Sequence, residues 1–177
     1  MNEHVLNKIK AELDKQGLDS IIKISDDHLI PSSLLIFGGV DKKERELKMV
    51  ISIQPLDMGS EFSENIEERN KKYVKIQLDA PFPFAVKDSA FAEVAQFLNF
   101  INLQIEVPGF YLNHFDNSIL YRCIQLTDAE HIPVTLLLGT IGISMLLHDT
   151  FSDQLELLAK GETTFAQLID EIQKMMK

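Results

Sequence analysis

The sequence has a single cysteine, Cys123. One cysteine cannot form an internal disulfide, so the fold depends on its hydrophobic core, and a reducing compartment, the cytoplasm, is the expected location. The first 15 residues carry charges throughout and contain no long apolar run. A secretory signal peptide needs such a run, so we do not expect this stretch to be one.

No long uninterrupted hydrophobic run is present either. The longest apolar region, residues 132–147, has 16 residues and is interrupted by proline, threonine, glycine and serine. A membrane-spanning helix needs about 20 predominantly apolar residues. We therefore expect a helix that is buried inside the protein, and no membrane insertion.

Motifs of catalysis and metal binding are also missing. The sequence contains no HExxH, CxxC, GxSxG or GxxxxGK[ST] pattern, and no two of its five histidines are spaced i,i+4. The Asp26-Asp27-His28 triplet offers metal-ligating atoms, but a polar turn before Pro31 explains it equally well. The prediction is a protein without metal, cofactor or catalytic residues.

A few chemically capable side chains remain. Cys123 lies in the middle of a predicted strand and suits a small buried hydrophobic residue. His148 is expected at the end of a helix, where it would complement the helix dipole. His114, Asp116 and Tyr121 fall on one predicted hairpin, and they support the alternative of an enzyme or small-ligand-binding protein with an unrecognised site.

Acidic residues outnumber basic ones. The net charge is −10, of which residues 88–177 contribute −8. Such a surface repels phosphate backbones, so we do not expect nucleic-acid binding. It suits a basic protein partner, or it serves solubility alone.

The apolar pattern of these 177 residues predicts one α+β domain over residues 1–177. We expect a mostly antiparallel sheet of about five strands flanked by helices, in the order α-β-β-β-α-β-β-α with an additional C-terminal helix at residues 163–176. The charged residues 57–72 are expected to form a loop insertion. Helices are expected at residues 2–16 and 89–103. Residues 132–148 and 152–159 are expected to form either two helical segments or one bent helix. A last helix is expected after the Thr164–Gln167 capping box. The expected strands are 20–24, 34–37, 47–54, 73–78, 110–113 and 119–126, the strand at 73–78 being ended by the prolines of residues 80–84.

The helix predicted at residues 89–103 is apolar around much of its circumference. A helix of this kind is buried on two sides. We therefore expect either a homodimer interface at Phe97, Phe100 and Ile101 or a central helix of a monomer.

Residues 89–163 resemble the YbjN-type family, which is related in fold to the class I chaperones of bacterial type III secretion. The features in common are Phe97-Leu98-Asn99 with Asn102, then Pro108-Gly109-Phe110, a hairpin with Tyr121-Arg122, and a helix that ends near Gly161-Glu162. The resemblance implies an α+β fold, frequent homodimers, and binding of an extended client segment without catalysis or ATP.

Our first functional hypothesis is therefore a non-enzymatic, chaperone-like protein-binding module, suited to a secretion chaperone, that works as a homodimer. An extended client could add to a strand edge, with alternate side chains in pockets. The candidate client-binding residues, which the pattern does not distinguish from core residues, are Leu34, Ile36, Met49 and Ile51. A structural subunit of a larger complex is a further alternative.

Overall fold

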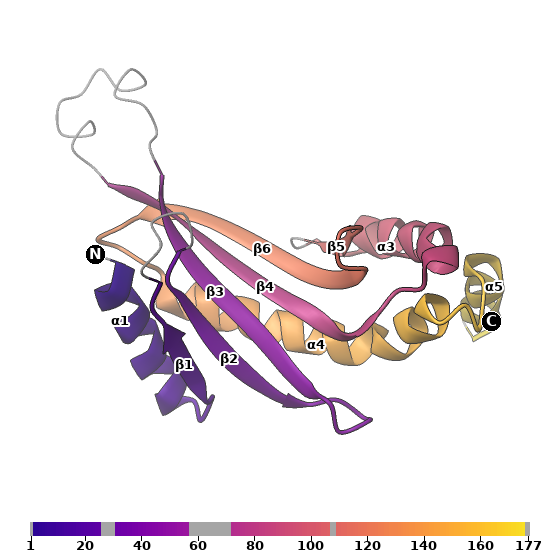
Figure 1. The fold of residues 1–177 in the computed structure, drawn as a ribbon, viewed down its shortest axis with the longest axis horizontal. Coiled ribbons are helices and arrows are strands. Elements are labelled where there is room, and N and C mark those ends of the chain that lie inside the picture. Colours follow the sequence, from indigo (N-terminus) through magenta and orange to yellow (C-terminus); the bar gives the residue numbers. More distant parts are fainter. Residues whose placement is uncertain (1, 26–30, 57–71, 107–108, 176–177) are drawn as a thin grey trace, which may run out of the picture. The chain divides into compact units, whose positions relative to one another are not determined.

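The computed structural model describes residues 2–25, 31–56, 72–106 and 109–175. These residues form an α+β fold with a six-stranded antiparallel sheet in the order β1-β2-β3-β4-β6-β5, together with flanking helices (Figure 1). The predicted fold class is confirmed. The sheet has six strands where about five were expected, and each of the six predicted strand ranges corresponds to one of them. The strands are β1 Ser20–Lys23, β2 Ser33–Val40, β3 Glu46–Leu56, β4 Tyr73–Ala85, β5 Phe110–Asn113 and β6 Ser118–Asp128. The helices are α1 Asn2–Lys15, the short 3-10 helix η1 Asp88–Ala90, α3 Phe91–Gln104, α4 Val134–Ala159 and α5 Phe165–Met175.

Two compact units divide the chain. Unit 1 comprises Met1–Gly39, Lys48–Asp79 and Cys123–Gly142, and unit 2 comprises Val40–Leu47, Ala80–Arg122 and Ile143–Lys177. The prediction of a single domain over residues 1–177 stays a prediction. Residues 57–71 of the predicted loop insertion at 57–72 lie outside the described residues, and so does the candidate metal triplet Asp26-Asp27-His28.

Unit 1 is organised by the period-two burial of its strands. β1 pairs antiparallel with β2, and β3 pairs antiparallel with β4 so that Ile51 lies opposite Leu78. Helix α1 packs on β1 (Figure 1) through its apolar stripe. The helix stops before Gly17, whose φ of 73° is a backbone conformation that glycine adopts without strain. The buried side chains of this unit include Val5, Leu6, Ile9, Leu13, Leu34, Ile36, Ile51, Ile53, Val74, Ile76 and Leu78.

Unit 2 contains the β5–β6 hairpin, in which Phe110 lies opposite Tyr121 and Asn113 opposite Ser118. Asn102 of α3 fixes the entry to β5. Its side-chain amide donates to the carbonyl of Phe110 at 3.0 Å, and its side-chain oxygen accepts the N–H of Phe110 at 2.8 Å. A Cβ at residue 109 would collide with this amide, so only glycine fits there. Asn102 and Gly109, two residues of the family resemblance, therefore have a structural role.

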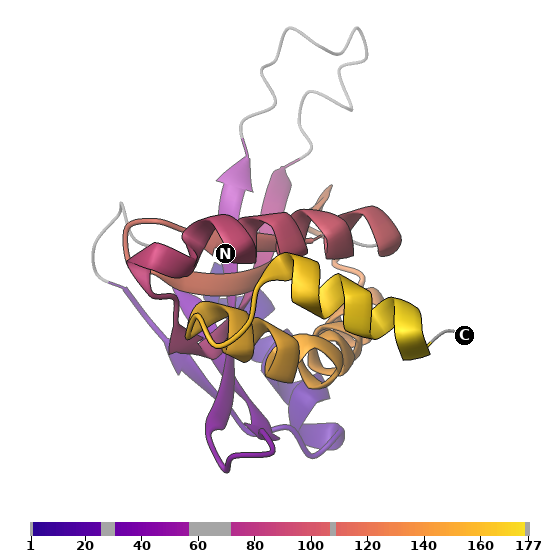
Figure 2. The ribbon, with the colours of Figure 1, turned by 90° about the vertical axis from the view of Figure 1, so that its right-hand side faces the viewer.

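Part of the apolar surface of α3 is covered by α5 of the same chain. Phe100 contacts Phe165 of α5 with ring centroids 6.3 Å apart, and Figure 2 shows α5 lying beside α3. The carboxylate of Glu93 accepts the N–H of Phe165 at 2.6 Å. The predicted capping box opens α5, since Thr164 N–H donates to Gln167 Oε1 at 3.0 Å and Gln167 N–H donates to Thr164 Oγ1 at 3.3 Å.

One predicted strand continues beyond its expected end, and one open alternative for a helix is decided. β4 does not stop at the prolines but continues to Ala85, with Ala80 and Phe82 still on the buried face. Its pairing with β3 covers Tyr73–Asp79, so Pro81 and Pro83 lie beyond that ladder and leave its hydrogen bonds intact. Of the two alternatives expected for residues 132–159, two segments or one bent helix, the structure has a single helix, α4.

Candidate functional site

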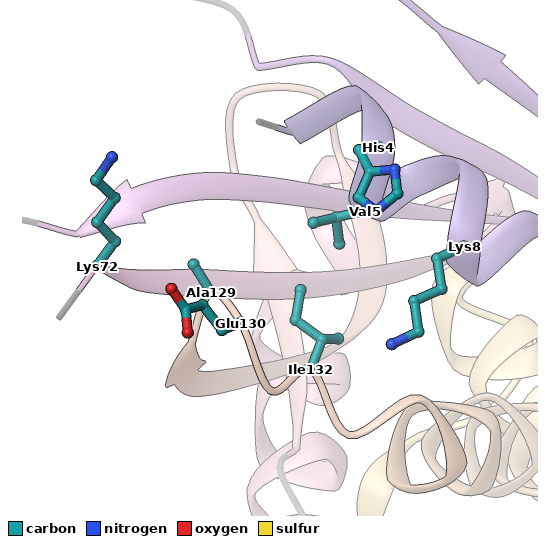
Figure 3. Close-up of a pocket in the computed structure, with 7 residues that line it drawn as sticks. All are labelled: His4, Val5, Lys8, Lys72, Ala129, Glu130 and Ile132. Atoms are coloured by element: carbon teal, nitrogen blue, oxygen red, sulfur yellow. The ribbon is translucent and has the colours of Figure 1, made fainter.

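A groove runs between α1 and the start of α4 in unit 1. Two adjoining cavities of about 410 Å³ and about 530 Å³ form it, and Lys8 and Ile132 line both. We call this the α1–α4 groove. Its first cavity is lined by His4, Val5, Lys8, Lys72, Ala129, Glu130 and Ile132 (Figure 3). Its second cavity is lined by Lys8, Glu12, Ile132, Pro133, Val134, Thr135, Leu136 and Leu138.

One wall of the groove is a side of α1. His4, Lys8 and Glu12 recur at i,i+4 spacing, so they form a single row along the helix. This row flanks the buried stripe that contains Val5 and Ile9 and packs toward the sheet. The eight residue steps from His4 to Glu12 extend over about 12 Å of helix, so the groove is elongated along α1.

The opposite wall is the connection from β6 to α4. The N–H of Ala129 donates to the carbonyl of Lys72 at 2.8 Å, which ties the connection to the residue before β4. Asp128 accepts the N–H of Glu130 at 2.8 Å through its side chain. Pro133 immediately precedes α4, a position where its missing N–H costs nothing. The wall is thus set by local hydrogen bonds and by a proline.

The lining combines an apolar floor with charged edges. Val5 and Ile132 are both buried, whereas Lys8 and Lys72 are exposed. Figure 3 shows the two lysines toward opposite ends of the first cavity, with Val5 and Ile132 between them. Such a surface can bind a ligand that has both apolar and charged groups.

Several apolar side chains of α4 are exposed. Leu136 has 66% of its surface exposed, and Ile143 and Leu146 follow it at i+7 and i+10 on the same side of the helix. Only 22% of the most apolar 18-residue window of α4 is buried. The expectation of a buried helix therefore holds for one face only. By length and composition α4 could also cross a membrane, a criterion that core helices of soluble proteins meet as well.

The predicted client-binding residues are in the core. Leu34, Ile36 and Ile51 have no exposed surface and Met49 is 3% exposed. A client cannot reach side chains buried to this extent, so these positions are core residues, which the sequence pattern had left open. The apolar side chains that surround these four residues belong to the same chain.

The predicted dimer residues are covered by the chain itself. Phe97 and Ile101 are each 1% exposed, and Phe100 is half-buried against Phe165. Their apolar surface is satisfied within unit 2, so they offer little to a second copy. Dimerisation through another surface stays a prediction.

The hairpin residues that supported an enzyme each have a structural partner. His114 stacks on Phe91 with ring centroids 4.6 Å apart. Asp116 accepts hydrogen bonds from the N–H and the hydroxyl of Ser118, at 3.1 and 2.6 Å. Tyr121 is 1% exposed and packs against Phe110. These contacts account for the three side chains as parts of the hairpin.

Two buried titratable groups, His148 and Cys123, line neither cavity of the groove. His148 is in the middle of α4 rather than at a helix end, because α4 is continuous, and its ring stacks on Phe82 at 4.1 Å. Burial lowers the pKa of this imidazole, although nearby backbone carbonyls, that of Ser144 first, oppose the effect. Cys123 is buried as predicted, and burial raises the pKa of its thiol.

The strongest electrostatic cluster surrounds Glu156 in unit 2. This carboxylate is 3% exposed and pairs with Arg45 at 2.7 Å, Lys160 at 2.7 Å and Lys43 at 3.0 Å. Burial raises the pKa of Glu156, but the hydrogen bonds from the three cations outweigh it and lower the pKa to about 2. Asp41 holds Arg45 from the other side and so completes a clamp between the β2–β3 turn and α4.

The sequence patterns did not identify the groove residues. The i,i+4 row of His4, Lys8 and Glu12 was the available signal, because it borders the apolar stripe of a predicted helix. Among the described residues no group of three or more histidine, cysteine, aspartate or glutamate side chains could hold a metal ion. No protein-family model matches the chain, and no curated protein sequence matches it.

Proposed function

We propose that this chain is a non-enzymatic, chaperone-like protein-binding module that holds a segment of a partner protein in the α1–α4 groove. The observation that carries the proposal is the groove itself, two adjoining cavities that open beside an exposed leucine on α4. Apolar surface left exposed next to a concavity is typical of a binding site for another protein.

The dimensions of the groove favour an elongated ligand. It extends along about two turns of α1, and its apolar floor continues into Leu136. Helix-in-groove recognition places apolar side chains at i, i+3, i+4 and i+7 into a surface of this kind. Val5 and Ile132 line the cavity and are each 8% exposed, so they supply the floor for those side chains, and the charged edges supply orientation.

The resemblance to YbjN-type proteins supports the same class of function, since their secretion-chaperone relatives in fold bind client segments without catalysis. It suggests protein binding in the cytoplasm, and homodimers remain part of the proposal. The alternative, a small-ligand-binding protein, has support from the cavity volumes, which fall within the range of about 300–1,000 Å³ for small-molecule sites.

The test uses two leucines that are both exposed. Leu136→Glu places a charge at the groove, whereas Leu103→Glu adds the same charge on α3, where Leu103 is 75% exposed. Tagged versions of both variants and of the unchanged protein are crosslinked in their native cells, and bound proteins are quantified by mass spectrometry. We expect one protein that the unchanged chain and Leu103→Glu retain and that Leu136→Glu loses by about tenfold or more, because a buried leucine contributes about 1.5–3 kcal/mol.

Two results would overturn the proposal. One is a set of bound proteins that Leu136→Glu leaves unchanged. The other is that no protein is bound, while the chain binds a small molecule or phosphatidylcholine vesicles and Leu136→Glu abolishes that binding. The first result removes the groove as the binding site, and the second changes the class of ligand.

A further inference from the structure

We infer that the α1–α4 groove selects an acidic amphipathic segment, with apolar side chains on the floor and carboxylates at the lysine edges. This inference rests on the proposed function and names the chemistry of the partner. It differs from what net charge alone suggests, because a chain of net charge −10 favours a basic partner.

The first observation concerns the ion pairing of the two lysines that line the groove. Among the residues that the structure describes, neither Lys8 nor Lys72 has an ion-pair partner. Elsewhere in the chain several lysines are paired, as Lys10 is with Asp14 at 2.9 Å. Unpaired ammonium groups beside a concave surface are available to a ligand.

The second observation concerns the carboxylates that could have neutralised them. Glu12 lies four residues after Lys8, the spacing of a helical ion pair, but Lys15 holds it at 2.6 Å. Glu130 is the acidic residue among those that line the first cavity, which also include two lysines and His4. The described lining of the first cavity therefore has two lysines against one glutamate, a net positive charge on an acidic protein.

The third observation is the apolar floor between the charges. Val5 and Ile132 lie between Lys8 and Lys72 in Figure 3. A free inorganic anion gains nothing from this floor, and a purely apolar segment leaves both ammonium groups unpaired. An amphipathic helix with leucines on one face and glutamates at its flanks satisfies both features.

A second copy of this chain is a weaker candidate for the occupant. Two copies of a molecule with net charge −10 repel each other wherever their acidic surfaces approach. A foreign segment brings its carboxylates to the lysines without that repulsion. The preferred occupant is accordingly a segment of another protein.

The experiment uses three fluorescein-labelled peptides with one leucine pattern at i, i+3, i+4 and i+7. Their polar positions are all glutamate, all glutamine or all lysine. Fluorescence anisotropy measures binding to the full chain, to the double variant Lys8→Gln with Lys72→Gln, and to Lys23→Gln. Lys23 is an exposed lysine of β1 that lines neither cavity, so its variant is the matched control. Glutamine is chosen because a new carboxylate at position 8 would repel Glu12.

We expect the glutamate peptide to bind about tenfold more tightly than the glutamine peptide, since each exposed ion pair adds up to about fivefold in affinity. The double variant should bind these two peptides equally, and Lys23→Gln should keep the preference. Salt at about 1 M should also remove the preference, because the Debye length falls to about 3 Å.

The inference is overturned if the glutamine or lysine peptide binds as tightly as the glutamate peptide, if the preference survives in the double variant, or if no peptide binds at about 1 mM. Self-association of the chain that the double variant weakens without added peptide would assign the groove to a second copy and overturn it too. Leu136→Glu separates this failure from that of the proposed function. If the three peptides bind the unchanged chain with equal affinity and Leu136→Glu abolishes their binding, the groove binds apolar segments and only the acidic preference is wrong.

Discussion

The cluster around Glu156 gives a quantitative prediction about stability. The three cations lower the pKa of this carboxyl from 4.5 to about 2. Each tenfold change in proton affinity corresponds to about 1.4 kcal/mol, so the ionised form contributes at most about 3 kcal/mol to the free energy of unfolding. Glu156→Gln keeps the shape of the side chain and removes its charge, and we expect it to lower the stability at pH 7 by about 2–3 kcal/mol.

The pH dependence of this difference has a definite sign. Because the folded pKa of Glu156 is below the unfolded value, its contribution is complete above about pH 4.5 and is lost as the pH falls toward 2. Urea unfolding of the unchanged protein and of Glu156→Gln should differ fully at pH 7 and converge between about pH 4.5 and pH 2. In thermal unfolding at pH 7 the midpoint should fall by roughly 5–10 °C.

The matched control for Glu156 lies on the same helix. Asp153 pairs with Lys42 at 3.1 Å, but both side chains are more than half exposed. Asp153→Asn should therefore unfold at the same midpoint as the unchanged protein. Equal losses for the two variants, or a Glu156→Gln difference that stays constant from pH 7 to pH 2.5, would refute the reasoning.

Two further predictions concern α3 with its loop and the buried thiol. Gly109→Ala and Asn102→Ala should each lower the free energy of unfolding in urea by about 1–3 kcal/mol. The double variant should lose less than the sum of the two, because the added methyl group no longer clashes once the Asn102 amide is gone. Additive losses would show that the two sites are independent. Cys123 should react with 5,5′-dithiobis(2-nitrobenzoate) at pH 8 far more slowly in the native protein than in urea, because burial disfavours its thiolate. Equal rates would contradict the buried position.

Local patterns predicted the elements whose determinants are close in sequence. The apolar stripe of α1 and the capping box of α5 both depend on residues within four positions of each other, and both are confirmed. The continuation of β4 through Pro81 and Pro83 was not predictable in this way. The length of β4 depends on which of its residues pair with neighbouring strands, and those strands are distant in sequence.

The site was harder to predict than the fold. Sequence patterns distinguish apolar from polar faces, but they do not tell which apolar face the same chain covers. Leu34 and Phe97 are apolar in pattern and buried in the structure, whereas Leu136 is apolar and exposed. The ion pairs of Glu156 were also not predictable from local patterns, because they join Arg45 to a residue 111 positions later.

The contact between α3 and α5 has a consequence for the order of folding. The N–H of Phe165 reaches Glu93 across 72 residues of sequence. At about 5–20 residues per second, a ribosome needs several seconds to make that stretch. During this interval the ring of Phe100 lacks the partner that later covers it, so the nascent chain passes through a stage in which α3 is open to aggregation or to a cellular folding factor.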